Sequence, residues 1–236
     1  MSADLLRLRT LSDVSAVDDV DDPKQLRRQA AQPQPSLRDR KRARTRQALV
    51  DAAITLFERD GYEHTTVADI AAAAEVGTRT FFNYFASKEE LLFPESDARV
   101  RATLEAIAGH EPSEGPADVL LRALQSVGAA SSDMTDGLAA LRLRLIRTVP
   151  AVRGRALQIQ LDAQREIARR LVEAFPDTLD EVAAAAVTGA FIGAITAALH
   201  VLLERAERPD DPAEFARLLR EATDLGLAPW SGARPG

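Results

Sequence analysis

The stretch from residue 78 to residue 88 concentrates side chains whose chemistry suits double-stranded DNA. Arg79 can donate two parallel hydrogen bonds to O6 and N7 of guanine, and Asn83 can bond an adenine or a phosphate. Thr78 can reach a base edge or the methyl group of thymine. A second set carries donors that suit phosphate oxygens, which position a protein on DNA without reading its sequence. This set comprises Thr66, Thr80, Tyr84 and Lys88.

Two short helices joined by a tight turn are needed to present these side chains. Thr66 and Asp69 are spaced as a capping box, which predicts a helix starting at Val67. Gly77 is expected to be the left-handed residue at the turn. In the next helix Phe81 and Phe85, four residues apart, predict an inward stripe. The pattern indicates a helix-turn-helix unit, although a plain helical bundle with a solvated polar face would share part of it.

At these residues the chain resembles the TetR family of bacterial transcriptional regulators, over residues 45 to 93. Phe82 is a departure, because the family often has a tyrosine there, and Tyr84 must then carry more of the backbone contact. The resemblance implies DNA binding through this segment. It runs through Gly61, Tyr62, Thr65, Thr66, Val67, Ile70, Ala71, Val76, Gly77, Thr80, Phe81, Tyr84, Phe85, Ser87, Lys88 and Leu91.

Charge is distributed unevenly along the 236 residues, whose formal net charge is −6. Residues 37 to 50 hold six basic side chains against one acidic side chain, while residues 94 to 236 hold the surplus of acid. The basic run includes Arg44 and Arg46, which we expect to contact DNA phosphates or a minor groove. The other interpretation of the run is a solvated surface cluster.

The helical pattern predicts an all-α protein, with turn residues between the helices and no convincing strand. We expect a disordered extension over 1–36, a helix-turn-helix domain over 37–93, a helical effector and dimerisation domain over 94–226 and a flexible tail over 227–236. Helices are predicted near 37–60, 96–110, 117–129, 135–147, 151–175, 179–206 and 212–225. Ser87 and Glu90 have the spacing of a second capping box.

The composition argues against several other classes of protein. Residues 183 to 203 approach the length of a membrane span, but their many alanines and glycines favour a buried helix. With no basic, apolar leader and no cysteine, a cytoplasmic protein without disulfides is expected. The three histidines (His64, His110, His200) stand far apart, so neither a metal nor another cofactor is predicted. No nucleophile or phosphate-binding motif suggests an enzyme.

A homodimer is expected, since one recognition helix reads too few base pairs to bind tightly alone. Gly189 and Gly193 form a small-residue face that lets another helix approach closely. The resemblance implies that the last two long helices form the subunit interface, which would add Phe215 and Leu219. Tight packing of this face inside one subunit is the alternative.

An effector cavity is expected between the helices after Pro94, because long helices of uneven length rarely close without a void. Its predicted lining comprises Leu120, Leu141, Leu145, Leu161, Phe191 and Ile195, with Gln158 and His200 at its edge. Residues 141 to 157 also resemble the acyl-CoA-responsive branch of the family, in which basic groups meet phosphates. The five arginines there can equally pair with the acidic surplus.

Taken together, these patterns predict a dimeric regulator, a repressor released from a palindromic DNA operator by a small apolar or amphipathic effector. The alternative is an architectural protein that keeps the DNA contacts and has no effector. An enzyme or carrier would require a catalytic group of residues that the chain lacks.

Overall fold

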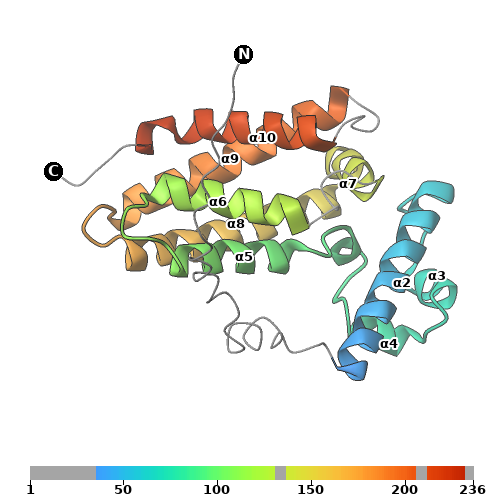
Figure 1. Ribbon diagram of the computed structural model, residues 1–236. Coiled ribbons are helices and arrows are strands. Elements are labelled where there is room, and N and C mark those ends of the chain that lie inside the picture. The colour runs from blue at the N-terminus through green and yellow to red at the C-terminus, as the bar shows by residue number, and fades with distance from the viewer. Residues whose placement is uncertain (1–35, 131–136, 206–211, 232–236) are drawn as a thin grey trace, which may run out of the picture. The chain divides into compact units, whose positions relative to one another are not determined.

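The computed structural model describes residues 36–130, 137–205 and 212–231, and within these ranges the fold is all-α, as predicted (Figure 1). The described part of the chain contains no strand. The predicted extension over 1–36 lies outside the described residues, except for Ser36. The chain divides into two compact units, residues 1–42 and 43–236, so this division falls within the first described helix.

Helix α2 (Leu37–Arg59) begins at a capping box that sequence analysis had not identified. The Asp39 amide donates to the Ser36 hydroxyl oxygen at 3.2 Å, and the Ser36 amide donates to the Asp39 carboxylate at 3.2 Å. After the helix ends, Gly61 adopts a φ of 85°, which glycine tolerates best. The apolar side chains of α2, among them Leu49, Ala53 and Phe57, are buried.

Helices α3 (Val67–Ala73) and α4 (Thr78–Phe82) form the predicted helix-turn-helix. The predicted Thr66–Asp69 capping box is confirmed, with both reciprocal hydrogen bonds present. The prediction for Gly77 is wrong, because Gly77 has a φ of −79° and Glu75 is the left-handed residue, at 55°. The amides of Glu75 and Val76 donate to Ala72 and Ala71, the pattern of a Schellman turn, and this pairing compensates for the strain at Glu75.

A short 3₁₀ helix, η1 (Glu89–Leu92), and Pro94 connect this unit to the remaining helices. Glu90 does not pair with Ser87 as a capping box would require. Its carboxylate instead accepts from the Ala86 amide at 2.7 Å and from Arg155 at 2.7 Å. The helices that follow are α5 (Ser96–Ala108), α6 (Pro116–Ala130), α7 (Gly137–Thr148), α8 (Pro150–Ala174), α9 (Glu181–Arg205) and α10 (Pro212–Leu227), before the 3₁₀ helix η3 (Ala228–Trp230).

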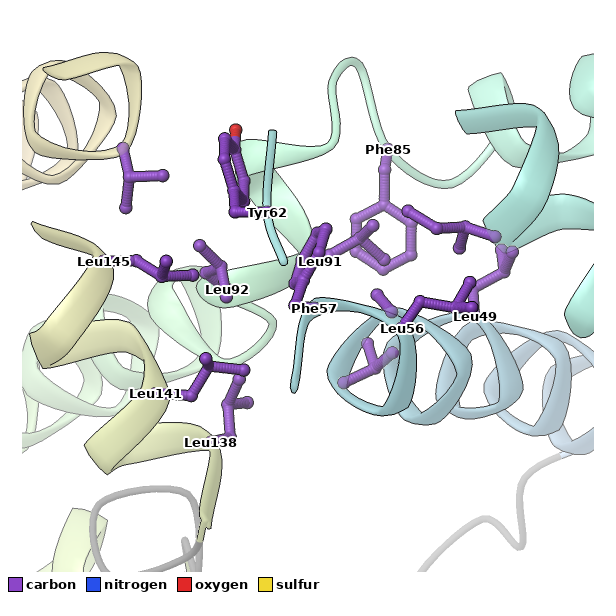
Figure 2. Packing of buried hydrophobic residues seen from close by; sticks show 14 of the residues in the cluster. Leu49, Leu56, Phe57, Tyr62, Phe85, Leu91, Leu92, Leu138, Leu141 and Leu145 are labelled. Atoms are coloured by element: carbon purple, nitrogen blue, oxygen red, sulfur yellow. The ribbon is translucent and has the colours of Figure 1, made fainter. Parts of the chain in front are cut away.

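Two hydrophobic cores hold the described residues together. The first joins side chains of α2, α3, α4 and η1 to one face of α7 and the start of α8, so Leu138, Leu141 and Leu145 lie in the same core as Leu92 (Figure 2). The second core joins α5, α6, α8, α9 and α10. Helix α7 is therefore part of the core that supports the helix-turn-helix.

Helix α9 is apolar and long enough to cross a membrane by length and composition, a test that core helices of soluble proteins also pass. It packs against α8 and α10. One face of α9, including Val187 and Phe191, is buried, as predicted, whereas another face, including Gly193 and Val201, is exposed. The prediction of a buried helix therefore holds for part of its circumference.

The folded chain extends beyond the predicted start of the tail at residue 227. Leu227 is fully buried in the second core, and Trp230 packs against that core. At the preceding residue, Gly226, there is no room for a side chain, because an added Cβ would lie 2.8 Å from Cβ of Ala194 in α9. Helices α9 and α10 therefore pack closely at Gly226, a residue at the predicted boundary of the tail. Residues 232–236 lie outside the described residues.

Candidate nucleic-acid interface and effector cavity

Helix α4 has one buried face and one exposed face. Phe81 and Phe85 are buried against the first core, as the sequence predicted. Thr80 and Tyr84 are half-buried. The exposed face consists of Thr78, Arg79, Phe82 and Asn83. Three of the four are the residues predicted to read bases, so the structure brings these three together on the side of the helix that faces away from the core.

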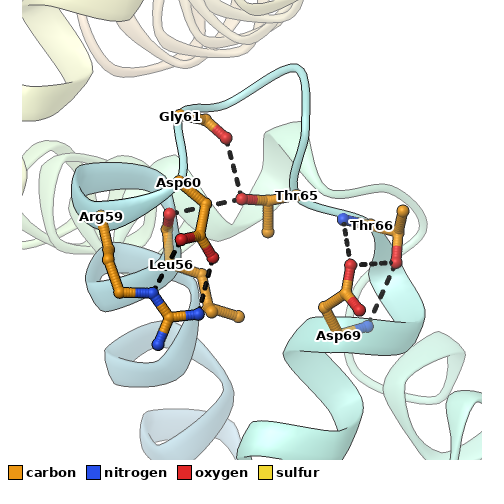
Figure 3. Close-up of polar contacts among 7 residues, drawn as sticks. All are labelled: Leu56, Arg59, Asp60, Gly61, Thr65, Thr66 and Asp69. Atoms are coloured by element: carbon orange, nitrogen blue, oxygen red, sulfur yellow. Dashed lines mark hydrogen bonds and ion pairs between the residues drawn. The ribbon is translucent and has the colours of Figure 1, made fainter.

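Thr65 and Thr66 fix the start of α3. The buried Thr65 hydroxyl donates to the Gly61 carbonyl at 2.8 Å and lies 3.4 Å from the Leu56 carbonyl, which ties the loop to the end of α2 (Figure 3). The exposed Thr66 hydroxyl donates to the Asp69 carboxylate at 2.6 Å and accepts from the Asp69 amide. The hydrogen bonds from Thr66 lower the pKa of Asp69. Thr66 is thus exposed, but its hydroxyl is already used by the cap.

Lys88 is predicted to contact phosphate, and the structure gives its ammonium group partners within the protein. Nζ donates to the carbonyls of Tyr62 at 2.8 Å and Thr65 at 3.1 Å, and it lies 4.1 Å from the centroid of the Tyr62 ring. These contacts close the loop between α2 and α3 onto the segment after α4. Lys88 therefore stabilises the domain that presents α4, a role that its position in the sequence does not reveal.

Tyr62 and Glu89 form a second link between the same two segments. The Tyr62 hydroxyl donates to Oε1 of Glu89 at 2.5 Å. Burial, together with the neighbouring Glu89 carboxylate, raises the pKa of Tyr62. Burial opposes ionisation of Glu89 as well, but hydrogen bonds from Ser87 and Tyr62 outweigh it and lower the pKa of Glu89. The pair is thus a neutral phenol bonded to a carboxylate at neutral pH.

The two arginines selected from the basic run differ in environment. Arg44 is exposed, as a phosphate contact requires. Arg46 is half-buried, and its Nη2 donates to the Pro94 carbonyl at 2.8 Å while its guanidinium lies 4.6 Å from the centroid of the Phe85 ring. Arg46 therefore joins α2 to the segment before α5, and its guanidinium already has partners within the protein.

A cavity of about 290 Å³ lies between α5, α7, α8 and α9. Apolar side chains make up most of its wall, and its polar groups come from several helices. The polar lining residues are Ser96, Arg99, Thr103, Arg142, Gln160, Thr196 and His200. No aspartate or glutamate is among the described residues that line it.

Three of the predicted lining residues, Phe191, Ile195 and His200, do line the cavity. Leu120 is instead buried in the second core, and Leu141 and Leu145 in the first. Gln158 and Leu161 are exposed on α8, and Gln158 accepts a hydrogen bond from Arg155 at 3.0 Å. The prediction that these five residues line the cavity is therefore wrong.

Most residues of α7 and α8 that do line the cavity are one or two positions away from a predicted residue. The lining residues of these two helices are Ala139, Arg142, Leu143, Ile146, Ala156, Ile159, Gln160, Ala163 and Ile167. One residue along a helix rotates the side chain by about 100°. A stripe of apolar residues therefore predicts that a helix has an inward face, but not which of two adjacent cavities or cores that face meets.

Comparison with known proteins identifies the helix-turn-helix segment. Residues 49–93 match the family model for bacterial regulatory proteins of the tetR family. This segment therefore resembles the DNA-binding domain of that family. The chain is 40% identical over 122 residues to the HTH-type transcriptional regulator TcmR of Streptomyces glaucescens. The aligned region covers 51% of this chain and 54% of the relative.

A second relative is the HTH-type transcriptional repressor LfrR of Mycolicibacterium smegmatis, 37% identical over 90 residues, or 37% of this chain and 46% of the relative. The chain thus spans about half the length of the curated relatives it matches.

Solved structures of TetR-family proteins share the fold over most of the chain. A putative TetR-family regulator from Syntrophomonas wolfei has a TM-score of 0.54 and 20% identity, covering 78% of this chain and 95% of its own. FadR of Thermus thermophilus, a TetR-family repressor solved with lauroyl-CoA, has a TM-score of 0.50 and 20% identity. The match covers 77% of this chain and 93% of the FadR chain. At this identity the likeness shows the fold alone.

The residues predicted to form the TetR-type dimer interface fall into two groups. Among the described residues, no atom of another helix lies within 4 Å of a Cβ added at Gly189 or Gly193, so these glycines make no close crossing with the described helices. The alternative of tight packing within one subunit is thereby removed for them. Phe215 and Leu219, by contrast, are buried in the protomer's own second core. A partner subunit could not reach these two side chains, so the proposed interface no longer includes them.

Proposed function

We propose that this protein is a dimeric transcriptional repressor whose affinity for a palindromic DNA operator falls when a small effector binds. The observation that carries the proposal is the exposed face of α4, where Thr78, Arg79 and Asn83 stand together on a TetR-family DNA-binding domain. Polar side chains on an exposed helical face can enter the major groove and bond base edges.

Helix α7 supports a response to ligand, because its two faces have different surroundings. Leu138, Leu141 and Leu145 lie in the core of the DNA-binding domain, and Arg142 and Ile146 line the cavity. Arg142 also donates from Nη1 to the Leu92 carbonyl at 3.2 Å, in the segment η1. A molecule that displaced the cavity face of α7 would therefore disturb the packing that supports α4. An effector lowers operator affinity only by its difference in affinity for the two conformations.

The cavity favours an effector with a compact apolar body and at least one hydrogen-bonding group. His200 is a suitable partner, since its Nδ1 lies 3.0 Å from the Thr196 carbonyl and must be the donor in that bond. In the neutral ring Nε2 is then left as an acceptor for a hydroxyl group. Gln160, which lines the cavity from α8, supplies both donors and an acceptor.

An acyl-CoA, the ligand class suggested by one branch of the family, is the second candidate. The structural neighbour from Thermus thermophilus, which holds lauroyl-CoA, supports it. Three of the arginines expected to meet phosphates bond within the protein instead. Arg155 bonds Glu90, Arg147 bonds Glu204, and Arg153 donates to the carbonyls of Ile146 and Arg147. The smaller effector is therefore the primary proposal.

Footprinting of the full-length protein on genomic DNA tests the regulatory function. A regulator protects a few palindromes, whereas an architectural protein protects many loosely related sites. Arg79→Ala should relax the selected sequence at one base pair of each half-site and cost about 1–3 kcal/mol of binding free energy. Protection of unrelated sites throughout the genome, or an unchanged motif for Arg79→Ala, would contradict the proposal.

Thermal-shift measurements test the effector. Small apolar alcohols and phenols on one hand, and acyl-CoAs of several chain lengths on the other, should be added to the free protein and to its operator complex. A true effector stabilises the free protein and releases DNA over the same concentration range, because both effects arise from one binding equilibrium. Stabilisation by acyl-CoAs alone would favour the second candidate.

A further inference from the structure

Phe82 is the apolar residue on the otherwise polar exposed face of α4. We propose that its ring contacts the 5-methyl group of thymine at one base pair in each half-site and so contributes to sequence selection. This inference rests on the proposed DNA-binding function and assigns a role to a residue for which the fold has no evident need.

The position of Phe82 excludes a role in either hydrophobic core. Its side chain is 58% exposed, whereas the neighbouring Phe81 is fully buried. In the helix Phe82 follows Thr78 by four residues and Arg79 by three, so all three share one face. Asn83 is exposed beside them. Any surface that bonds Arg79 or Thr78 to base edges must therefore also cover the ring of Phe82.

The ring is held in place from behind. Its centroid lies 5.3 Å from that of Phe81, with the two planes inclined at 81°, an edge-to-face arrangement. Phe81 in turn packs against Phe85, whose ring is covered by the Arg46 guanidinium. The fully buried Phe81 ring thus supports one side of the Phe82 ring, while most of the Phe82 side chain faces outward.

The major groove offers one apolar group that distinguishes bases, the thymine methyl, and aromatic side chains are suited to contact it. Phe82 has no donor, so it cannot bond a phosphate oxygen or a base edge. Burying one methyl group against it should change affinity roughly four-fold at each half-site. Two equivalent half-sites acting independently should give roughly sixteen-fold.

A uracil scan of the operator tests the proposal with the full-length protein. Each thymine is replaced in turn, symmetrically in both half-sites, by deoxyuridine, which lacks only the methyl group. For the wild type, one position should lose roughly sixteen-fold in affinity, measured by fluorescence anisotropy at fixed salt. Phe82→Ala should bind the thymine operator more weakly and should no longer distinguish uracil from thymine at that position.

Two further comparisons make the result specific. Phe82→Tyr keeps the ring, so it should retain the discrimination against uracil at the same position, and Phe82→Leu serves if Phe82→Ala binds too weakly to measure. Replacing that base pair by one containing 5-methylcytosine should recover part of the affinity lost with plain cytosine.

Two results would overturn the proposal. In the first, the wild type tolerates uracil at every position. In the second, Phe82→Ala and Phe82→Leu show the same discrimination as the wild type, which would mean that the ring rests on a sugar or another residue reads the methyl. In either case sequence-specific binding would still support the regulatory function. Failure to find any specific operator would instead remove both proposals.

Discussion

Arg155 in α8 donates from Nη2 to Oε1 of Glu90 in η1 at 2.7 Å, although 65 positions separate the two residues in the sequence. Both side chains are less than one-third exposed, and Nε of Arg155 is buried with no hydrogen-bond partner among the described residues. The same Glu90 carboxylate also accepts from the Ala86 amide at 2.7 Å. One carboxylate thus joins the end of the helix-turn-helix to α8, one of the helices that line the cavity.

Replacing Arg155 by methionine should lower the free energy of unfolding by about 1–3 kcal/mol, between the values typical of exposed and of buried ion pairs. Arg169→Met is the control, because Arg169 bonds Glu166 and Glu173 on the exposed side of the same helix. Its effect should stay within about 0.5 kcal/mol. Denaturant unfolding measures both variants. Equal losses of unfolding free energy would show that the Arg155–Glu90 pair stabilises the protein no more than an exposed ion pair does.

Lys88→Met should destabilise the DNA-binding domain, because Nζ bonds two carbonyls and lies over the Tyr62 ring. Hydrogen bonds to a charged group and a cation–π contact predict a loss of about 1–3 kcal/mol. Circular dichroism melting curves check this. Arg79→Ala, at an exposed site, is the comparison and should weaken operator binding with little change in melting temperature. If Lys88→Met instead melted like the wild type and bound all DNA sequences more weakly, Lys88 would be a phosphate ligand.

Gly226→Val should destabilise the protomer by about 1–3 kcal/mol, because its Cβ would lie 2.8 Å from Cβ of Ala194 and force two helices apart. Gly189→Leu and Gly193→Leu provide the contrast, since a Cβ at either position would meet no atom of another described helix within 4 Å. These two variants should leave the protomer folded and weaken the proposed dimer. Sedimentation velocity and thermal melting separate the effects. A fully dimeric Gly193→Leu variant would place the interface elsewhere.

Ala163→Leu should reduce the effector response without abolishing DNA binding, because Ala163 lines the cavity and three added carbons would occupy part of its volume. Ala151→Leu, at an exposed site on the same helix, is the matched control. The concentration of effector needed for half-maximal release of operator DNA is the measurement. Equal responses in the two variants would argue that the effector binds outside this cavity.

Arg44→Gln should change the salt dependence of DNA binding, whereas Arg46→Gln should change the stability of the protein. Losing one phosphate contact at the exposed Arg44 should reduce the slope of log affinity against log salt by about 0.9 in each subunit. Arg46→Gln removes the hydrogen bond to the Pro94 carbonyl, so it should chiefly lower thermal stability. Titrations at four salt concentrations, with melting curves, distinguish the two. An unchanged slope for Arg44→Gln would assign the basic run to the solvated surface.

The sequence by itself determined the features that depend on residues close together in the chain. The Thr66–Asp69 cap and the inward pair Phe81 and Phe85 follow from spacings of three and four residues, which place the groups within one turn of helix. Thr78, Arg79 and Asn83, at the remaining positions around this helix, are exposed. These local rules were enough to predict an all-α protein with a helix-turn-helix.

Tertiary structure decided what each inward face meets. Leu141 and Leu145 belong to the core under the helix-turn-helix, while their neighbours Arg142 and Ile146 line the cavity, because a rotation of about 100° per residue separates the two environments. Lys88 and Arg46 carry the charge of a phosphate ligand, yet carbonyl groups distant in sequence bind their cations. The left-handed residue proved to be Glu75, since a turn's hydrogen bonds can outweigh the cost of a side chain there.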